Sequence, residues 1–357
     1  MNSFENNIIQ EDMNIIYKSI DYSIFNNKSV FISGAAGMLA SYMVYFLIYL
    51  NENIEGFKCK IILNVKQKSK LQARYGLYLN KDYLKIYESD LSEKIEIEDN
   101  IDFIIHAASI AQTQFFSTNP IDVILPNTIG TKNLLDLAYV KNVQSFLFFS
   151  TCSVYGKVSH SNYIDEETFG VLDPLDVNSC YSESKRLGES LCKAYYTQKN
   201  VNVKISRIAH TYGPTIDIDN DNRVFSEFIK NIVNNENIIL KSKGDAVRSF
   251  LYLRDATIAF YKILINGKCG EAYNVSNPDQ NVSIKELANR LVKEFQEKNL
   301  EIEYSEKDVT YEENKFDNKI IYSIEKLQKV GWEPTVSIEE GFRRTVNSIK
   351  EEKKWKK

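Results

Sequence analysis

A tyrosine and a lysine four positions apart, Tyr181 and Lys185, are the residues of this sequence best suited to chemistry. Side chains at this spacing lie one turn apart on the same face of a helix. The charge of a neighbouring ammonium lowers the pKa of a phenol, which is otherwise about 10, so the phenol exchanges a proton nearer neutral pH. Such a pair can abstract the proton of an alcohol while a bound nicotinamide takes the hydride.

A glycine-rich turn far upstream of this pair predicts a dinucleotide site. The turn follows the apolar run Val30–Ser33 and leads into an apolar helix that starts at Met38. We expect Gly34 to allow a tight bend, Gly37 to let a pyrophosphate approach the backbone, and Ala40 to permit close packing of helix on strand. The helix N-terminus then offers amide donors and a positive dipole to the phosphates.

The choice between NAD and NADP should be set at the end of the second strand. An acidic residue about 20 positions after the glycines would bind the adenosine ribose and favour NAD. The sequence has Asn64 there, an amide that tolerates either ribose, and Lys66 or Lys68 suits a 2′-phosphate. NAD is therefore favoured only slightly over NADP. Further along the chain, Asp90 and Leu91 are expected at the adenine, and the small residues Ala107, Ala108 and Ser109 beneath the cofactor.

The order of elements predicts an α/β fold. Short apolar runs at 30–33, 60–63, 101–107, 145–150 and 202–210 alternate with helical patterns, which implies a doubly wound parallel sheet with right-handed crossovers. After about residue 215 the segments become shorter and mixed, with a helix near 284–295. The predicted parts are a helical arm (1–27), a mainly dinucleotide-binding domain (28–215), a mainly substrate-binding lobe with some interleaving (216–346) and a basic, solvated tail (347–357).

The bulk composition narrows the possible partners. The chain has 357 residues and a net charge of −4, which gives no electrostatic case for nucleic acid or an anionic membrane. Its five cysteines are an odd number without a Cys-x-x-Cys pair, as expected for reduced thiols in the cytoplasm. The first residues do not have the pattern of a signal peptide. The apolar stretch 38–50 is shorter than the roughly 20 residues of a membrane span. No metal site is expected.

With these residues in view, the chain resembles the extended short-chain dehydrogenase/reductase family, in its nucleotide-sugar epimerase, dehydratase and decarboxylase branch. The resemblance runs from about residue 28 to 346. It includes the segments Gly34–Ala40, His106–Ser109, Asn127–Thr131, Ser150–Gly156, Tyr181–Lys185, Arg207–Pro214, Arg248–Tyr252 and Gly331–Pro334. It implies a Rossmann-type domain with a smaller C-terminal α/β lobe that binds a nucleoside diphosphate sugar.

The resemblance also implies roles for individual residues. Tyr181 would act as general base or acid at a sugar hydroxyl, usually at C4, Lys185 would bind the nicotinamide ribose, and Thr151 would hydrogen-bond the same sugar oxygen. Arg248 would clamp the pyrophosphate, for which a guanidinium fork is suited. His210, in place of a common asparagine, either contacts the substrate or is a hydrogen-bonded residue of the cleft wall. The remaining implied cofactor contacts are Ala36, Met38, Leu39 and Asn127, and the remaining substrate contacts are Ser109, Cys152, Ser153 and Arg223. Arg223 and Arg207 are weaker candidates, and each is either a substrate contact or a structural ion-pair partner.

The residues after Thr151 bear on the reaction. Dehydratases of this branch carry an Asp-Glu pair there, and elimination of water needs both an acid and a base. This chain has Cys152 and Ser153, which argues against 4,6-dehydration and more gently against decarboxylation. A 4-epimerase is the first expectation and a 4-keto-sugar reductase or 4-dehydrogenase the second. A non-catalytic dinucleotide sensor is the alternative from another class. A homodimer is expected from the family.

Overall fold

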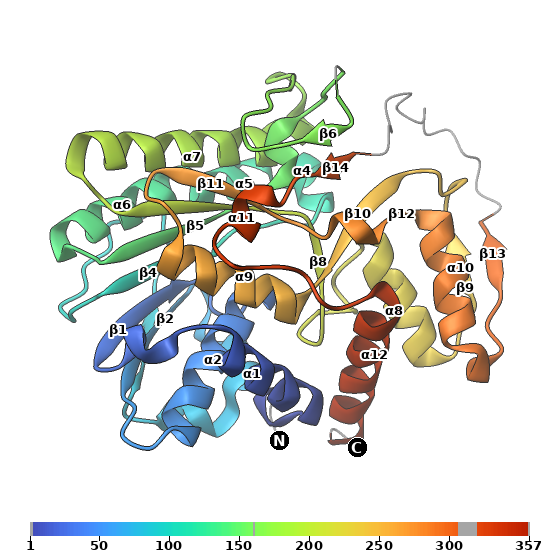
Figure 1. Ribbon diagram of the computed structural model, residues 1–357, viewed down its shortest axis with the longest axis horizontal. Helices are drawn as coiled ribbons and strands as arrows, with labels where there is room; N and C mark the ends of the chain where they lie inside the picture. Colours follow the sequence, from blue (N-terminus) through green and yellow to red (C-terminus); the bar gives the residue numbers. More distant parts are fainter. Residues whose placement is uncertain (1–2, 160, 306–319, 356–357) are drawn as a thin grey trace.

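A seven-stranded parallel sheet forms the centre of the computed structural model, which describes residues 3–159, 161–305 and 320–355 (Figure 1). The strand order is β11-β7-β5-β4-β1-β2-β3, with β1 at the point where the order reverses. This confirms the doubly wound fold. The strands span β1 Lys28–Ser33, β2 Cys59–Val65, β3 Leu84–Glu88, β4 Phe103–His106, β5 Ser145–Thr151, β7 Val203–Ile208 and β11 Glu271–Val275.

Helices cover both faces of this sheet because its central strands are apolar on both sides. Buried side chains of α1, α2 and α9 form one large core with the sheet, and those of α6 and α7 form a second core on the opposite face. Figure 1 shows α6 and α7 above the sheet and α1, α2 and α9 below it. Their bounds are α1 Asn7–Ser19, α2 Met38–Asn53, α5 Pro120–Asn127, α6 Ile129–Lys141, α7 Cys180–Lys199 and α9 Leu253–Asn266; two short helices are α3 Leu71–Tyr75 and α4 Gln114–Thr118.

A smaller lobe with its own apolar core lies beside the C-terminal edges of the strands. Its elements are the sheet β12-β10-β8, the pair β13-β9, and helices α8, α10 and α12. Their bounds are β8 His210–Tyr212, α8 Val224–Asn234, β9 Ile238–Leu240, β10 Val247–Tyr252, β12 Asn281–Ser283, α10 Ile284–Glu294, β13 Ile302–Tyr304 and α12 Ile338–Trp355. The remaining short elements are β6 Tyr163–Ile164, β14 Ile321–Tyr322 and α11 Glu325–Gln328.

The two halves of the chain interleave. Helix α9 and strand β11 lie late in the sequence but pack on or extend the main sheet, where β11 pairs with β7. The part of the basic tail that the structure describes departs from expectation, because α12 continues to Trp355. The tail residue Lys353 donates a hydrogen bond to Asn234 of α8 at 3.2 Å.

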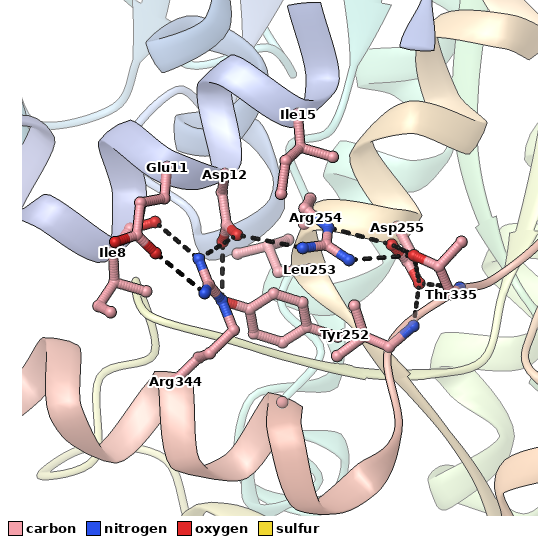
Figure 2. A network of polar contacts seen from close by, with 12 residues as sticks. Ile8, Glu11, Asp12, Ile15, Tyr252, Leu253, Arg254, Asp255, Thr335 and Arg344 are labelled. Atoms are coloured by element: carbon pink, nitrogen blue, oxygen red, sulfur yellow. Dashed lines mark hydrogen bonds and ion pairs between the residues drawn. The ribbon is translucent and has the colours of Figure 1, made fainter. Parts of the chain in front are cut away.

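The N-terminal arm is fixed to both halves by one carboxylate. Asp12 of α1 is fully buried and accepts hydrogen bonds from Tyr42 of α2 at 2.8 Å and Tyr252 of β10 at 2.7 Å. Arg344 of α12 donates to its other oxygen at 2.8 Å, and Arg254 of α9 lies 3.8 Å from it (Figure 2). Burial raises the pKa of Asp12, whereas the charge of Arg344 and the two phenols oppose that rise. The arm is thus a structural part of the contact between main sheet and smaller lobe.

Candidate active site

A cleft of about 2190 Å³ gathers the residues expected to carry the chemistry. All the expected site residues line it except Asn127 and the weaker candidates Lys68 and Arg207. Asn127 is instead fully buried, and its side-chain amide donates to the carbonyl of Val123 and to the Ser184 hydroxyl, each at 3.0 Å. It therefore ties α5 to α7 behind the cleft. The lining residues are Gly34, Ala36, Gly37, Met38, Leu39, Asn64, Lys66, Asp90, Leu91, Ala107, Ala108, Ser109, Thr151, Cys152, Ser153, Tyr181, Lys185, His210, Arg223 and Arg248.

The glycine turn is shaped for a close backbone approach. Gly34 has φ +65°, and a Cβ there would lie 2.6 Å from the Cα of Ala108. The Ser33 hydroxyl accepts hydrogen bonds from the amides of Ala107 and Ala108, which fixes the loop after β4 beside the turn. Gly37 is the N-cap of α2, so the first amides of that helix face the cleft mouth without a capping side chain. A dinucleotide pyrophosphate fits this arrangement.

One buried group beneath the cofactor region also fits a bound ligand. The Ser109 hydroxyl is buried and has no hydrogen-bond partner among the described residues. Such a hydroxyl normally finds a partner. Because Ser109 lines the cleft after Ala107 and Ala108, a ligand seated on these small residues would supply one.

At the adenosine end of the expected cofactor site, Asn64 and Lys66 both bind other side chains of the protein. The Asn64 side-chain amide donates to the Ser89 hydroxyl at 2.8 Å, so it ties β2 to the end of β3. Lys66 forms an ion pair with Asp90 at 2.8 Å. The hydrogen bond from Lys66, together with a second one from the backbone amide of Ser92, lowers the pKa of Asp90 to about 2. The ammonium proposed for a 2′-phosphate is thus already neutralised, which favours the plain ribose of NAD.

The catalytic candidates come from two adjacent elements. Thr151 ends β5, and Tyr181 and Lys185 lie in the first turns of α7. Lys185 is buried, donates to the carbonyl of Phe149 at 2.6 Å and lies 4.8 Å from the centre of the Phe148 ring. Burial lowers the pKa of Lys185 to about 7.

The pKa of Tyr181 corrects one expectation. Burial raises it, whereas a hydrogen bond with Thr151 and the charge of Arg223 lower it. The expected lowering by Lys185 does not appear among these causes, and the Lys185 ammonium donates to the strand carbonyl of Phe149. The partner of the phenol in the cleft is the hydroxyl of Thr151.

Residues 152 and 153 supply no ionisable group at neutral pH. Cys152 is buried, its thiol lies 3.4 Å from the carbonyl of Arg207, and burial raises its pKa. The Ser153 side chain is exposed in the cleft, 3.2 Å from the Thr151 hydroxyl. Neither serves as the acid or base of an elimination.

An aromatic residue that the motifs did not single out lies on the ring of Tyr181, the candidate catalytic tyrosine. Phe116 of α4 stacks on Tyr181, with ring centroids 5.1 Å apart and planes inclined by 10°. The same short helix reaches the smaller lobe, because Asn222 donates a hydrogen bond to Gln114. No motif marks this segment, and only its position after β4 and Ser109 signals its proximity to the site.

The substrate end of the cleft holds three expected residues. The His210 side chain is open to the cleft, yet the enclosing walls lower its pKa to about 3, and the charges of Arg248 and Arg223 add to that effect. The histidine is therefore neutral at pH 7. Arg223 pairs with the buried Asp221 through Nε and Nη2, at 2.9 and 2.5 Å. Arg248 lines the cleft from β10, where its Nη1 donates to the carbonyl of Val247 at 2.8 Å.

Arg207 lies outside the cleft lining. It forms a two-pronged ion pair with Glu189 of α7, with Nη2 2.8 Å from the carboxylate. Arg207 is therefore an ion-pair residue between β7 and α7 and not a residue of the cleft wall. Within the described ranges, no cluster of three or more His, Cys, Asp or Glu side chains is placed to hold a metal ion. No helix in those ranges is long and apolar enough to span a membrane.

Comparison with known proteins is consistent with this geometry. UDP-glucuronic acid decarboxylase 1 of Xenopus tropicalis is 31% identical over 331 residues, covering 92% of this chain and 73% of its own length. The solved UDP-glucose 4-epimerase of Thermotoga maritima with UDP-glucose superposes with TM-score 0.76 at 21% identity, over 91% of this chain and 99% of that one. The UDP-glucuronic acid 4-epimerase of Bacillus cereus in complex with NAD gives TM-score 0.72 at 21% identity, over 91% and 98%.

The family model that matches is the NAD dependent epimerase/dehydratase family, over residues 30–276. The matched region includes the glycine turn, the Tyr181–Lys185 pair and strand β11. The chain therefore belongs to this family of NAD-dependent nucleotide-sugar enzymes, within the extended short-chain dehydrogenase/reductases.

Proposed function

We propose that the protein transfers a hydride at C4 of a nucleoside diphosphate sugar, as a 4-epimerase. The observation that carries the proposal is the arrangement of Thr151, Tyr181 and Lys185 in one cleft with the glycine turn, while Cys152 and Ser153 supply no acid or base. An epimerase needs only proton transfer at one hydroxyl together with reversible hydride transfer.

The residues divide the work as follows. Bound NAD would supply the reversible hydride transfer at C4. Tyr181 takes the proton of the C4 hydroxyl and gives it back, and Thr151 holds the same oxygen by a hydrogen bond. Lys185 in its ammonium form binds the ribose beside the nicotinamide. The first amides of α2 bind the cofactor pyrophosphate, and Arg248 binds the diphosphate of the sugar nucleotide.

Decarboxylation of a uronic acid is the second candidate, because a relative 31% identical to this chain bears that name. Oxidation at C4 of such a sugar gives a β-keto acid, which loses carbon dioxide and then needs a proton at C5. Ser153 is not ionisable at neutral pH, so the proton donor would have to come from elsewhere in the cleft. The sequence left room for reduction of a 4-keto sugar by NADPH, whose 2′-phosphate Lys66 would bind. The structure supports this less, because Asp90 neutralises Lys66.

The test is a product screen. Purified protein, with its bound cofactor identified by mass spectrometry, is incubated with a panel of UDP-, dTDP-, GDP- and CDP-sugars, neutral and uronic. A product of unchanged mass with inverted C4, without net NADH, supports the epimerase. Release of carbon dioxide supports the decarboxylase, and net consumption of added NAD(P)H supports the reductase. Bound cofactor without any turnover supports a non-catalytic sensor and contradicts the proposal.

We also infer a homodimer in the cytoplasm. Leu187 of α7 is 51% exposed and Ile129 of α6 is 43% exposed, although both helices are otherwise packed on the sheet. Two copies joined through these helices would bury such side chains. Sedimentation that gives the mass of one chain would contradict the dimer.

A further inference from the structure

A largely buried carboxylate, Glu189, lies behind the proposed catalytic residues and outside the cleft lining. It stands four positions after Lys185 on α7, hence one turn further along the same face. Its side chain is 12% exposed. The Ser150 hydroxyl donates to Oε1 at 2.5 Å, and the guanidinium of Arg207 donates through Nε at 3.1 Å and Nη2 at 2.8 Å.

These contacts join the three elements that form the floor of the catalytic centre. Ser150 directly precedes Thr151 on β5, and Arg207 lies on the neighbouring strand β7. Arg207 is itself held, because its Nη1 donates to the Tyr155 hydroxyl at 3.1 Å and to the carbonyl of Glu166 at 2.9 Å. Glu189 thus connects the helix that carries the tyrosine and lysine to the strand that carries the threonine.

We propose that Glu189 is a positioning residue, which fixes α7 against the end of β5 and supports the positive charge of Lys185. The inference rests on the function proposed above, because it assigns Tyr181, Lys185 and Thr151 to one reaction. Misplacing a reacting group by about 1 Å lowers turnover by roughly 100-fold. Glu189 accepts a hydrogen bond from Ser150, one residue before Thr151, and therefore controls the distance between Thr151 and the residues of α7.

The charges around Lys185 predict the direction in which its pKa moves when Glu189 or Arg207 is replaced. Burial lowers the pKa of Lys185, and on α7 Cys192 and, to a smaller extent, Glu189 raise it. From β4, His106 is close enough to interact with Lys185, and burial keeps that histidine neutral by lowering its pKa to about 3. From β7, Arg207 lies behind Glu189 and compensates its charge. Removal of the carboxylate should therefore make Lys185 easier to deprotonate, and removal of the guanidinium should do the opposite.

Three substitutions separate the two parts of the role. Glu189→Gln is expected to lower kcat by roughly 10- to 100-fold and to move the alkaline limb of the pH profile to lower pH. Arg207→Gln should move that limb to higher pH. Ser150→Ala removes the hydrogen bond to the strand but no charge, so kcat should fall while the alkaline limb stays in place. Glu183→Gln is the matched control, since Glu183 lies on the same helix, paired with Arg186 at 3.6 Å near the surface.

General damage to the fold cannot produce shifts of opposite sign, so the pair of charge variants distinguishes positioning from mere stability. Wild-type kcat and an unmoved alkaline limb in Glu189→Gln would overturn the inference. If that variant does not fold, full kcat in Ser150→Ala or an alkaline limb of Arg207→Gln moved to lower pH overturns it instead.

A second readout does not depend on turnover. The titration of Lys185 can be followed by NMR in ¹⁵N-lysine-labelled protein, with its signal assigned through Lys185→Arg. The expected order of midpoints is Glu189→Gln, wild type, Arg207→Gln, from low to high pH. If the wild type converts no nucleotide sugar, the proposed function fails; identical midpoints in all three proteins overturn the role of Glu189 separately.

Discussion

The ring of Phe116 lies parallel to the ring of Tyr181, with centroids 5.1 Å apart. This pair joins two loops that the sequence keeps far apart, the segment after β4 and the start of α7. The stack covers one face of the phenol and restricts its rotation. The orientation of the Tyr181 hydroxyl therefore depends on a residue that has no polar side-chain atom.

Phe116→Ala should lower kcat by roughly 2- to 10-fold, because stacked aromatic pairs contribute roughly 0.5–1.5 kcal/mol. Cofactor binding should be nearly unchanged. Steady-state kinetics together with calorimetric titration of NAD measure the two effects. The control is Phe169→Ala, whose side chain is 77% exposed. Equal kinetics for both variants would mean that the stack has no part in catalysis.

Tyr181→Phe should reduce turnover by at least 10²- to 10⁴-fold, the usual contribution of a positioned acid or base. The ring and its stack on Phe116 are preserved, so NAD binding should remain. Rate and cofactor content are measured on the same sample. Retention of more than a tenth of wild-type kcat would remove the assigned role of the phenol.

The stability of the cofactor-free protein should rise with pH above neutrality because of Lys185. Burial lowers its pKa to about 7, whereas in the unfolded chain it stays near 10.5. Between these values the unfolded state binds more protons than the folded state, so the free energy of unfolding increases with pH. Lys185→Met removes this contribution. Chemical denaturation from pH 6.5 to 9.5 should give a steeper rise for the wild type, and parallel curves would contradict the buried ammonium.

Asp90→Asn should increase the affinity for NADP relative to NAD. The substitution removes the anion that neutralises Lys66 at 2.8 Å, so the ammonium becomes available to a 2′-phosphate. Fluorescence titrations with NADPH and NADH give the ratio. In contrast, Asn64→Asp should leave that ratio unchanged and lower the stability by about 1–3 kcal/mol, because the Asn64 amide donates to Ser89. A large change of cofactor preference in Asn64→Asp would show that its side chain reaches the ribose.

Asp12→Asn should destabilise the protein by about 3–5 kcal/mol, since it leaves the guanidinium of Arg344 beside a neutral group in a buried cluster. Glu11→Gln is the control, because Glu11 contacts the same arginine at 3.0 Å but is 58% exposed, where ion pairs contribute up to about 1 kcal/mol. Calorimetry of both variants gives the comparison. Equal losses of stability would mean that the arm is held by apolar packing alone.

The sequence predicted those features that depend on short-range patterns. The apolar runs at 30–33 and 145–150 became β1 and β5 because buried parallel strands are apolar on both faces. The glycine turn could be placed because residues other than glycine rarely adopt the positive φ of Gly34, and a Cβ there would meet the loop after β4. Tyr181 and Lys185 could be paired because helical spacing fixes their common face.

Features that depend on long-range packing were not predictable. The stack of Phe116 on Tyr181 joins residues 65 positions apart without a local signal. The Lys185 ammonium donates to the carbonyl of Phe149, and the expected effect of Lys185 on the pKa of Tyr181 is not found. The continuation of α12 into the tail follows from its packing on the smaller lobe, where Val346 and Ile349 are buried.

The most direct measurement follows the hydrogen of C4. A nucleotide sugar accepted in the product screen is prepared with deuterium at C4 and mixed rapidly with the NAD-loaded protein, and cofactor and sugar are analysed by mass spectrometry after quenching. We expect deuterium to appear transiently in bound NADH and then at C4 of the product with inverted configuration. Product formed without deuterium ever entering the cofactor would contradict hydride transfer at C4.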